Sequence, residues 1–208
     1  MAVILCFIKI FSIRNKSCSI ISCHIRFRHT SFFCTFRSFC VILCFMETIY
    51  HILLPIYDAN SRILILGTFP SPKSRAQGFY YGHPQNRFWH VLSTVLQEPL
   101  PTSIEEKRAM LLRRGIALWD VLASCKITGA ADSSIHDPVA NDFTPIFAAA
   151  DIRAVFTTGR VAAKFYTRLC GSGCICLPSP SPANCAMPFS ALAEAYRAIL
   201  PYLLQPLP

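Results

Sequence analysis

The sequence predicts an α/β protein: a three-layer α/β/α sandwich with a central, mostly parallel sheet of four strands. Two observations carry this prediction. Short apolar runs alternate along the chain with segments of helical periodicity, which is typical of parallel strands joined by helices. The runs are also apolar throughout instead of alternating with polar residues, which indicates strands buried on both faces of the sheet.

The four expected strands are short and rich in branched apolar residues. They lie at 63–66, 116–121, 154–157 and 174–177. Helical patterns separate and follow them, and Ser103 with Glu106 forms a capping box that opens one of these helices. The expected helices cover 86–97, 103 to Gly115, 143–150, 160–170 and 188–200, the last with Pro188 at its first position.

Three loops leave the expected strands with unusual chemistry. They lie at 67–71, 123–135 and 178–184. In open parallel sheets, ligands bind beyond the carboxyl ends of the strands. We therefore expect these three loops to converge on one cleft.

The chain changes character near Met46. Residues 1–45 contain six Lys and Arg, six Cys and no Asp or Glu, whereas the remaining residues hold 14 cations against 11 acids. The net charge of +9 thus divides into +6 on this segment and +3 on the rest. We expect residues 1–45 to be a basic, Cys-rich extension, disordered or translated from a start upstream of the true one, and 46–208 to be the folded domain.

Two other interpretations of the extension stay open. An acid-free leader with Arg and Ser resembles an organelle transit peptide, and its first eight residues resemble the apolar part of a signal without a preceding cation. No run reaches the ~18 uninterrupted apolar residues of a membrane helix, so we expect no spanning segment. The predicted location is the cytoplasm, with organelle targeting as the alternative.

The five cysteines after Met46 do not form a metal motif. They lack the paired C-x-x-C spacing of zinc and iron–sulfur sites, and Cys174 and Cys176 are expected to be small core residues of the last strand. An odd number of unpaired thiols favours a reducing compartment. We expect no metal and no cofactor.

The segment 78–89, GFYYGHPQNRFW, is the strongest functional signal. It crowds aromatic rings, an amide and a histidine around a proline, which a core helix does not need. A pocket that stacks a flat ring and places polar groups against it does need them. This segment is therefore the leading candidate for the active site.

Together with GTFPS at 67–71 and LPSPSPAN at 177–184, this segment resembles the uracil-DNA glycosylase superfamily. The resemblance is closest to its hypoxanthine (deoxyinosine) branch, followed by the mismatch-specific uracil/thymine glycosylases, and covers about residues 46–200. It implies a monofunctional DNA glycosylase that flips a deaminated base out of DNA and hydrolyses its N-glycosidic bond in base excision repair.

The resemblance also implies roles for individual residues. Many relatives carry a polar, water-orienting residue at the position of Phe69, and in the hypoxanthine branch Asn86 takes over this catalytic role. The alternative is that Asn86 caps the helix it begins. Tyr81 matches the aromatic that stacks the flipped base, while Phe88 and Trp89 are expected in the core.

Other polar residues of these loops are candidates for base or backbone contacts. Ser179 stands where relatives often carry His or Asn, which removes one means of stabilising the departing base and weighs against strong activity on uracil. His83 either contacts a purine edge or makes a turn. Phe69, Tyr81, His83 and Ser134 are expected at the base, Ser71, Lys73, Ser179, Ser181 and Asn184 at the DNA backbone, and Arg75, Arg87 and Lys126 near phosphates.

The predicted partner is double- or single-stranded DNA that contains a deaminated base, bound by a monomer. Hypoxanthine is the favoured base because of Phe69 and the GHPQN stretch. The alternatives are uracil or a mismatched pyrimidine, and a catalytically inactive DNA-binding module of the same fold. No lysine in the motifs offers an amine nucleophile, so we expect no lyase step.

Overall fold

The computed structural model describes residues 5–12, 18–26, 41–44, 47–129 and 131–203. The chain forms two compact units, Met1–Glu47 and Thr48–Pro208. The first contains an antiparallel sheet of β1 (Leu5–Ser12), β2 (Cys18–Arg26) and β3 (Val41–Cys44), in that order. The sequence did not predict these strands, since a disordered extension was expected there. The interpretation that the native chain begins at Met46 stays a prediction.

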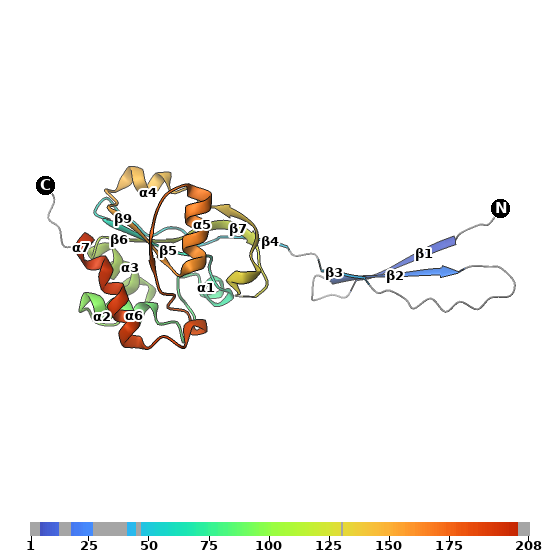
Figure 1. Cartoon of the computed structure of the whole chain (residues 1–208), viewed down its shortest axis with the longest axis horizontal. Coiled ribbons are helices and arrows are strands. Elements are labelled where there is room, and N and C mark those ends of the chain that lie inside the picture. Colours follow the sequence, from blue (N-terminus) through green and yellow to red (C-terminus); the bar gives the residue numbers. More distant parts are fainter. Residues whose placement is uncertain (1–4, 13–17, 27–40, 45–46, 130, 204–208) are drawn as a thin grey trace. The chain divides into compact units, whose positions relative to one another are not determined.

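The second unit is built on a parallel sheet with the strand order β10-β9-β5-β6. Its strands β9, β5 and β6 are labelled in Figure 1. All five residues of the central strand β5 are buried, as expected for a strand covered on both faces. The four predicted strands are therefore confirmed. Their bounds are Ile63–Gly67 for β5, Ile116–Asp120 for β6, Ala154–Thr158 for β9 and Ile175–Leu177 for β10.

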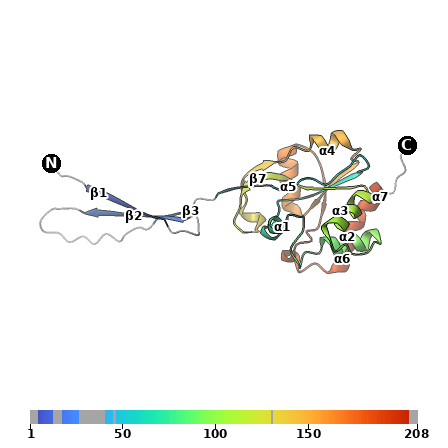
Figure 2. The ribbon, with the colours of Figure 1, turned by 180° about the vertical axis from the view of Figure 1, so that it is seen from behind.

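Helices cover both faces of this sheet, which confirms the three-layer sandwich. Ile63 and Ile65 pack on one face in a cluster with residues of α2 (Phe88–Leu96), α3 (Ile104–Arg113) and α6 (Phe189–Tyr196). Leu64 and Leu66 pack on the other face with α4 (Thr144–Ala149) and α5 (Arg160–Cys170). Figure 2 shows the same two layers from behind.

The expected helices are confirmed with shifts at their ends. The capping box of Ser103 and Glu106 opens α3, and the chain turns at Gly115 with φ 66°. Pro188 is the N-cap residue of α6 and not its first helical position. After α6, the backbone tightens into a 3₁₀ turn at Arg197–Ile199 and resumes as the short α7 (Leu200–Leu203).

A second, antiparallel sheet was not predicted. Its strands are β4 (Thr48–Tyr50), β7 (Leu122–Lys126) and β8 (His136–Ala140), in the order β4-β7-β8. The expectation of a loop at 123–135 is thus wrong for its first four residues. They form a strand because the chain leaves the parallel sheet after β6 and pairs with both β4 and β8. A 3₁₀ turn, η1 (Asp132–Ser134), lies in the remaining loop.

Two further short helices flank the cleft loops. The unpredicted α1 (Pro72–Gln77) has Ser71 as its N-cap, Pro72 at its start and Gly78 in the left-handed region as its C-cap. A 3₁₀ turn, η2 (Pro182–Asn184), lies in the loop after β10. Among the described residues, no helix has the length and apolarity to cross a bilayer.

The expectation that Cys174 and Cys176 are both core residues is wrong. Cys174 is half-buried and Cys176 is exposed. The reason is that β10 is the edge strand of the parallel sheet, so one side of it has no neighbouring strand.

Candidate active site

A cleft of about 1040 Å³ lies at the carboxyl ends of the parallel strands. Residues 67–71, residues between Ile127 and Ser133, and residues 178–184 all line it, together with Tyr81, His83 and Asn86. The three loops predicted to converge therefore do so, and the aromatic segment joins them. This convergence follows from the parallel sheet, which brings all carboxyl ends to one edge.

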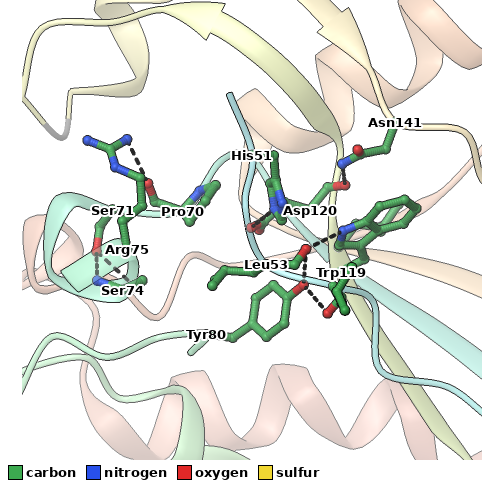
Figure 3. A network of polar contacts seen from close by, with 12 residues as sticks. His51, Leu53, Pro70, Ser71, Ser74, Arg75, Tyr80, Trp119, Asp120 and Asn141 are labelled. Carbon is green, nitrogen blue, oxygen red and sulfur yellow. Dashed lines mark hydrogen bonds and ion pairs between the residues drawn. The ribbon is translucent and has the colours of Figure 1, made fainter. Parts of the chain in front are cut away.

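Asp120 is a buried carboxylate that lines this cleft. It is the last residue of β6, its side chain is 6% exposed, and its Oδ2 lies 2.9 Å from Nε2 of His51, itself 2% exposed (Figure 3). Because an ionised carboxylate only accepts hydrogen bonds, the ring nitrogen is the donor. Asn141 also donates its side-chain amide to the backbone carbonyl of Asp120 at 2.9 Å. These contacts hold the carboxylate in one place.

The second carboxylate oxygen, Oδ1 of Asp120, has no hydrogen-bond partner among the described residues. No fully buried side-chain oxygen or nitrogen in these ranges lacks a partner, so Oδ1 is open to the cleft. A largely buried anion with a free oxygen is unfavourable unless a donor reaches it. This oxygen is therefore a ready acceptor for a hydrogen-bond donor of a bound ligand.

Gly67 makes room for this acceptor. It pairs with Asp120 across β5 and β6, and a Cβ at position 67 would collide with Oδ1 and lie 3.3 Å from the hydroxyl oxygen of Tyr81. Only glycine leaves both groups in place.

Aromatic rings fix the imidazole of His51. Its ring centroid lies 5.9 Å from that of Phe69, 6.3 Å from Tyr80 and 6.2 Å from Trp119. The backbone N–H of His51 donates to the carbonyl of Ala123 at 2.7 Å, so β7 anchors this segment as well. Phe69 lines the cleft next to this pair.

The cleft holds a second carboxylate, Asp132, in η1. The hydroxyl of Thr68 donates to its Oδ2 at 2.8 Å, and both residues line the cleft. Burial raises the pKa of Asp132 above its ordinary value, and the nearby charge of Asp120 raises this pKa further, whereas the hydrogen bond from Thr68 lowers it. The net shift is upward.

Tyr81 presents a fixed aromatic ring to the cleft. One face stacks on Phe88 with the ring centroids 3.8 Å apart and 14° between the planes, and its hydroxyl bonds that of Thr158 at 3.0 Å. Burial raises the pKa of Tyr81 far above its ordinary range, so the hydroxyl stays neutral. Phe88 and Trp89 are buried, which confirms both as core residues.

Asn86 lies in the cleft and also contacts the start of α2. Its Oδ1 accepts the backbone N–H of Phe88, the first residue of α2, at 2.9 Å, but the N-cap position itself is Arg87, one residue later than the capping interpretation placed it. A carbonyl oxygen has a second lone pair, and Nδ2 has no partner among the described residues. The side chain thus keeps capacity to bind a water, and its catalytic role stays a prediction.

His83 combines its place in the cleft with a turn. Its Nδ1 accepts the backbone N–H of Gln85 at 3.1 Å, as the turn interpretation predicts. Ser71 likewise lines the cleft while its hydroxyl accepts the N–H of Ser74 at 3.2 Å as the cap of α1. His83 keeps its Nε2 for a ligand, whereas the single hydroxyl of Ser71 also bonds that of Ser74 at 3.1 Å.

The loop 178–184 is tied together by its own polar side chains. Ser179 Oγ accepts the N–H of Ser181 at 3.3 Å, Ser181 Oγ accepts that of Ala183 at 3.2 Å, and Asn184 donates its amide to the carbonyl of Ser179 at 2.9 Å. All four line the cleft. The serine hydroxyls act here as acceptors and keep their O–H groups to donate.

Two expected phosphate contacts are engaged within the protein. The guanidinium of Arg87 donates to the carbonyls of Met187 at 2.6 Å and Asn184 at 2.8 Å, which fastens the loop after β10 to the start of α2. Lys126 forms an ion pair with Asp137 at 2.8 Å. Their charges have internal partners that the sequence did not reveal.

The structure does not bring two predicted site residues to the cleft. The hydroxyl of Ser134 donates to the carbonyl of Ala131 at 2.7 Å and accepts the N–H of Thr128 at 3.0 Å, which closes the loop on itself. Lys73 is exposed on α1. Neither belongs to the lining.

Sequence reasoning missed His51 and Asp120. Asp120 carried a signal, since a carboxylate ends an otherwise apolar strand at the edge where ligands bind. His51 had none, because it lies 69 positions from its partner. No group of three His, Cys, Asp or Glu within the described ranges is placed to hold a metal ion.

Comparison with known proteins agrees with this geometry. The sequence model of the uracil DNA glycosylase superfamily matches residues 54–203, which include the parallel sheet and all the loops of the cleft. The chain belongs to the uracil DNA glycosylase superfamily. It is a DNA glycosylase with DNA as its substrate, as the resemblance of the three motifs implied.

Two relatives within the superfamily come from Methanosarcina species. The chain is 36% identical over 133 residues to a hypoxanthine DNA glycosylase from Methanosarcina acetivorans, which covers 62% of this chain and 84% of the relative. It is 40% identical over 91 residues to a protein of the same name from Methanosarcina barkeri, covering 43% of this chain and 58% of that protein.

A solved glycosylase-like structure matches as well. The solution NMR structure of a candidate uracil DNA glycosylase from Methanosarcina acetivorans superposes with a TM-score of 0.62 at 30% identity. The match covers 74% of this chain and 99% of that structure. The superfamily fold thus extends over most of this glycosylase.

Proposed function

We propose that this glycosylase removes hypoxanthine, the product of adenine deamination, from DNA in base excision repair. The observation that carries the proposal is the free Oδ1 of Asp120, a buried acceptor in the cleft. Deamination replaces the N1 lone pair of adenine by an N1–H group. The carboxylate oxygen accepts this hydrogen and repels the lone pair, so it distinguishes the damaged base from the normal one.

The size of this discrimination follows from hydrogen-bond energetics. A hydrogen bond to a charged group contributes about 1.5–3 kcal/mol, and leaving the buried partner unpaired costs about the same again or more. Sites built to hydrogen-bond one polar group reject analogues that lack it by about 10⁴-fold or more. The arrangement of Asp120 and His51 is therefore sufficient to prevent removal of normal adenine from DNA.

Two observations favour hypoxanthine over uracil. The two relatives at 36% and 40% identity are named hypoxanthine DNA glycosylases. Ser179 also offers only a neutral hydroxyl where a histidine or an amide would stabilise a departing pyrimidine anion. Uracil is the second candidate because its N3–H matches the acceptor of Asp120 equally well.

The remaining residues complete the reaction cycle. The flipped base stacks against Tyr81, and Asn86 orients the water that attacks the sugar C1′ as the N-glycosidic bond breaks. Flipping requires a few kcal/mol, less at a mispaired base. A monomer performs this reaction on single- or double-stranded DNA in the cytoplasm.

The DNA backbone is held by the rims of the cleft. Ser71, Ser179, Ser181 and Asn184 lie on these rims and donate to phosphates, while Lys73 approaches from the exposed side of α1. The +3 charge of residues 46–208 fits few phosphate contacts and easy product release.

The test uses the full chain and labelled duplexes that carry a single inosine, uracil or adenine at one position. Alkali cleaves the strand wherever a base has been removed. We expect cleavage at inosine, weaker cleavage at uracil and none at adenine. Cleavage at uracil alone would overturn the hypoxanthine assignment and favour the second candidate.

A further inference from the structure

Hydrolysis of the N-glycosidic bond requires a group that takes a proton from the attacking water. An amide such as that of Asn86 orients a water but is far too weak a base to accept the proton. Among the described lining residues, the carboxylates are Asp120 and Asp132. Asp120 is already engaged by His51, and its free oxygen faces the site assigned to the base edge.

We propose that Asp132 is the general base of this glycosylase. The water oxygen forms a bond to C1′, the C1′–N bond breaks, and its electron pair leaves with the base. One proton of the water moves to the Asp132 carboxylate and from there to the departed base. The products are an abasic sugar with a C1′ hydroxyl and the free base, and the carboxylate is regenerated.

The geometry suits this role. Thr68 holds Oδ2 of Asp132 at 2.8 Å, while Oδ1 has no partner among the described residues and belongs to a cleft-lining side chain. Thr68 follows directly after β5, and the turn η1 places Asp132 over it. The side chain of Phe69, next to Thr68, has no polar atom that could accept a proton. The carboxylate near the end of β5 is instead that of Asp132, which belongs to the loop with η1.

The charges around Asp132 favour proton uptake. The groups that act on it are the carboxylate of Asp120 from β6 and the hydroxyl of Thr68. From β7 it faces the thiol of Cys125, on which Arg75 of α1 also acts. Because burial and Asp120 together raise the pKa of Asp132, the carboxylate is a stronger base than an exposed aspartate.

The sign of the pH dependence follows directly. The base works only when ionised, so the hydrolysis rate falls as the pH drops through the raised pKa of Asp132. The hydrogen bond from Thr68 stabilises the ionised form, and its removal moves this fall to a higher pH.

The experiment measures single-turnover base release by the full chain from about pH 4 to pH 9. Asp132→Asn should lower the rate about 10²-fold or more and remove the acidic fall, with DNA binding within about twofold. Formate should partly restore Asp132→Ala, since a small carboxylate replaces the missing base. Asp137→Asn, an exposed aspartate on the same hairpin, is the matched control and should retain the parent rate and profile.

Thr68→Val provides an independent measurement if Asp132→Asn fails to fold. In this variant the fall of the base-release rate at acidic pH should move to a higher pH. An Asp132→Asn rate within threefold of the parent, an unchanged acidic fall, or an unshifted profile in Thr68→Val would overturn the proposal. The inference rests on the proposed hydrolysis but not on which nucleobase is removed. A parent protein that releases only uracil would refute the hypoxanthine assignment. The same pH profiles, measured on uracil, would still test Asp132.

Discussion

Replacing Gly67 by alanine tests the packing of the cleft floor. The added Cβ collides with Oδ1 of Asp120 and crowds the hydroxyl of Tyr81. Relief requires either rotation of the carboxylate, which breaks its 2.9 Å contact with His51, or separation of β5 from β6. Both responses damage the site.

The expected magnitude comes from these two responses. Overpacking a closely packed site destabilises by about 1–3 kcal/mol, and loss of a hydrogen bond to a charged group contributes about 1.5–3 kcal/mol. We therefore expect Gly67→Ala to lower the free energy of unfolding by about 1–3 kcal/mol. The rate of base release should fall by at least tenfold, since 1.4 kcal/mol corresponds to a factor of ten.

The assay compares urea unfolding and single-turnover base release with a matched alanine substitution. Gly173→Ala is the control, because a Cβ at that exposed position meets no atom within 4 Å. It should leave both quantities unchanged. If Gly67→Ala matched this control in unfolding midpoint and rate, the close approach of Asp120 to position 67 would be refuted.

Substitutions at three further positions test neighbouring parts of the site. Asn86→Ala should lower turnover about 10²-fold or more with little change in DNA binding, and loss of its hydrogen bond to the backbone N–H of Phe88 should reduce stability by about 1 kcal/mol. Equal losses in turnover and binding would contradict a catalytic role. Tyr81→Phe should retain base release because the ring remains, whereas Tyr81→Leu should weaken the substrate complex by about 1–3 kcal/mol; equal rates and affinities in both would exclude stacking. Arg87→Met should release the loop that carries Asn184, seen as faster proteolysis at 182–188 and weaker DNA binding, and unchanged proteolysis would contradict the clamp.

The parallel sheet could be predicted because burial determines its sequence pattern. Strands covered by helices on both faces must be apolar throughout, and β5 shows this in every residue. The carboxyl ends of parallel strands meet at one edge, so the positions of the loops, and hence of the cleft, followed from the strands alone.

The antiparallel sheet could not be predicted in the same way. β4 has three residues and pairs with β7 more than seventy positions later, so no local pattern marks either strand. The six residues of α1 are similarly too few to show helical periodicity. Ser71, Pro72 and Gly78 were nevertheless readable as its start and stop signals.

Individual side chains were least predictable where one polar group has several possible partners. Ser134, Arg87 and Lys126 have the chemistry of ligand contacts, yet the structure uses them to close a loop, fasten a loop and pair an aspartate. The pair of His51 and Asp120 illustrates the converse, since only the fold brings the two residues together.

The central claim is that Asp120 recognises hypoxanthine by accepting a hydrogen bond from its N1–H group. Asp120→Asn tests this claim most directly. Because His51 donates to this side chain, the amide should turn its oxygen to His51 and its NH₂ group to the cleft, where it matches the N1 lone pair of adenine. The measurement is the ratio of hypoxanthine to adenine released from otherwise identical duplexes. We expect this ratio to fall at least 10²-fold relative to the parent, as about 3 kcal/mol of lost discrimination implies. An unchanged ratio in a folded, DNA-binding variant would contradict the claim.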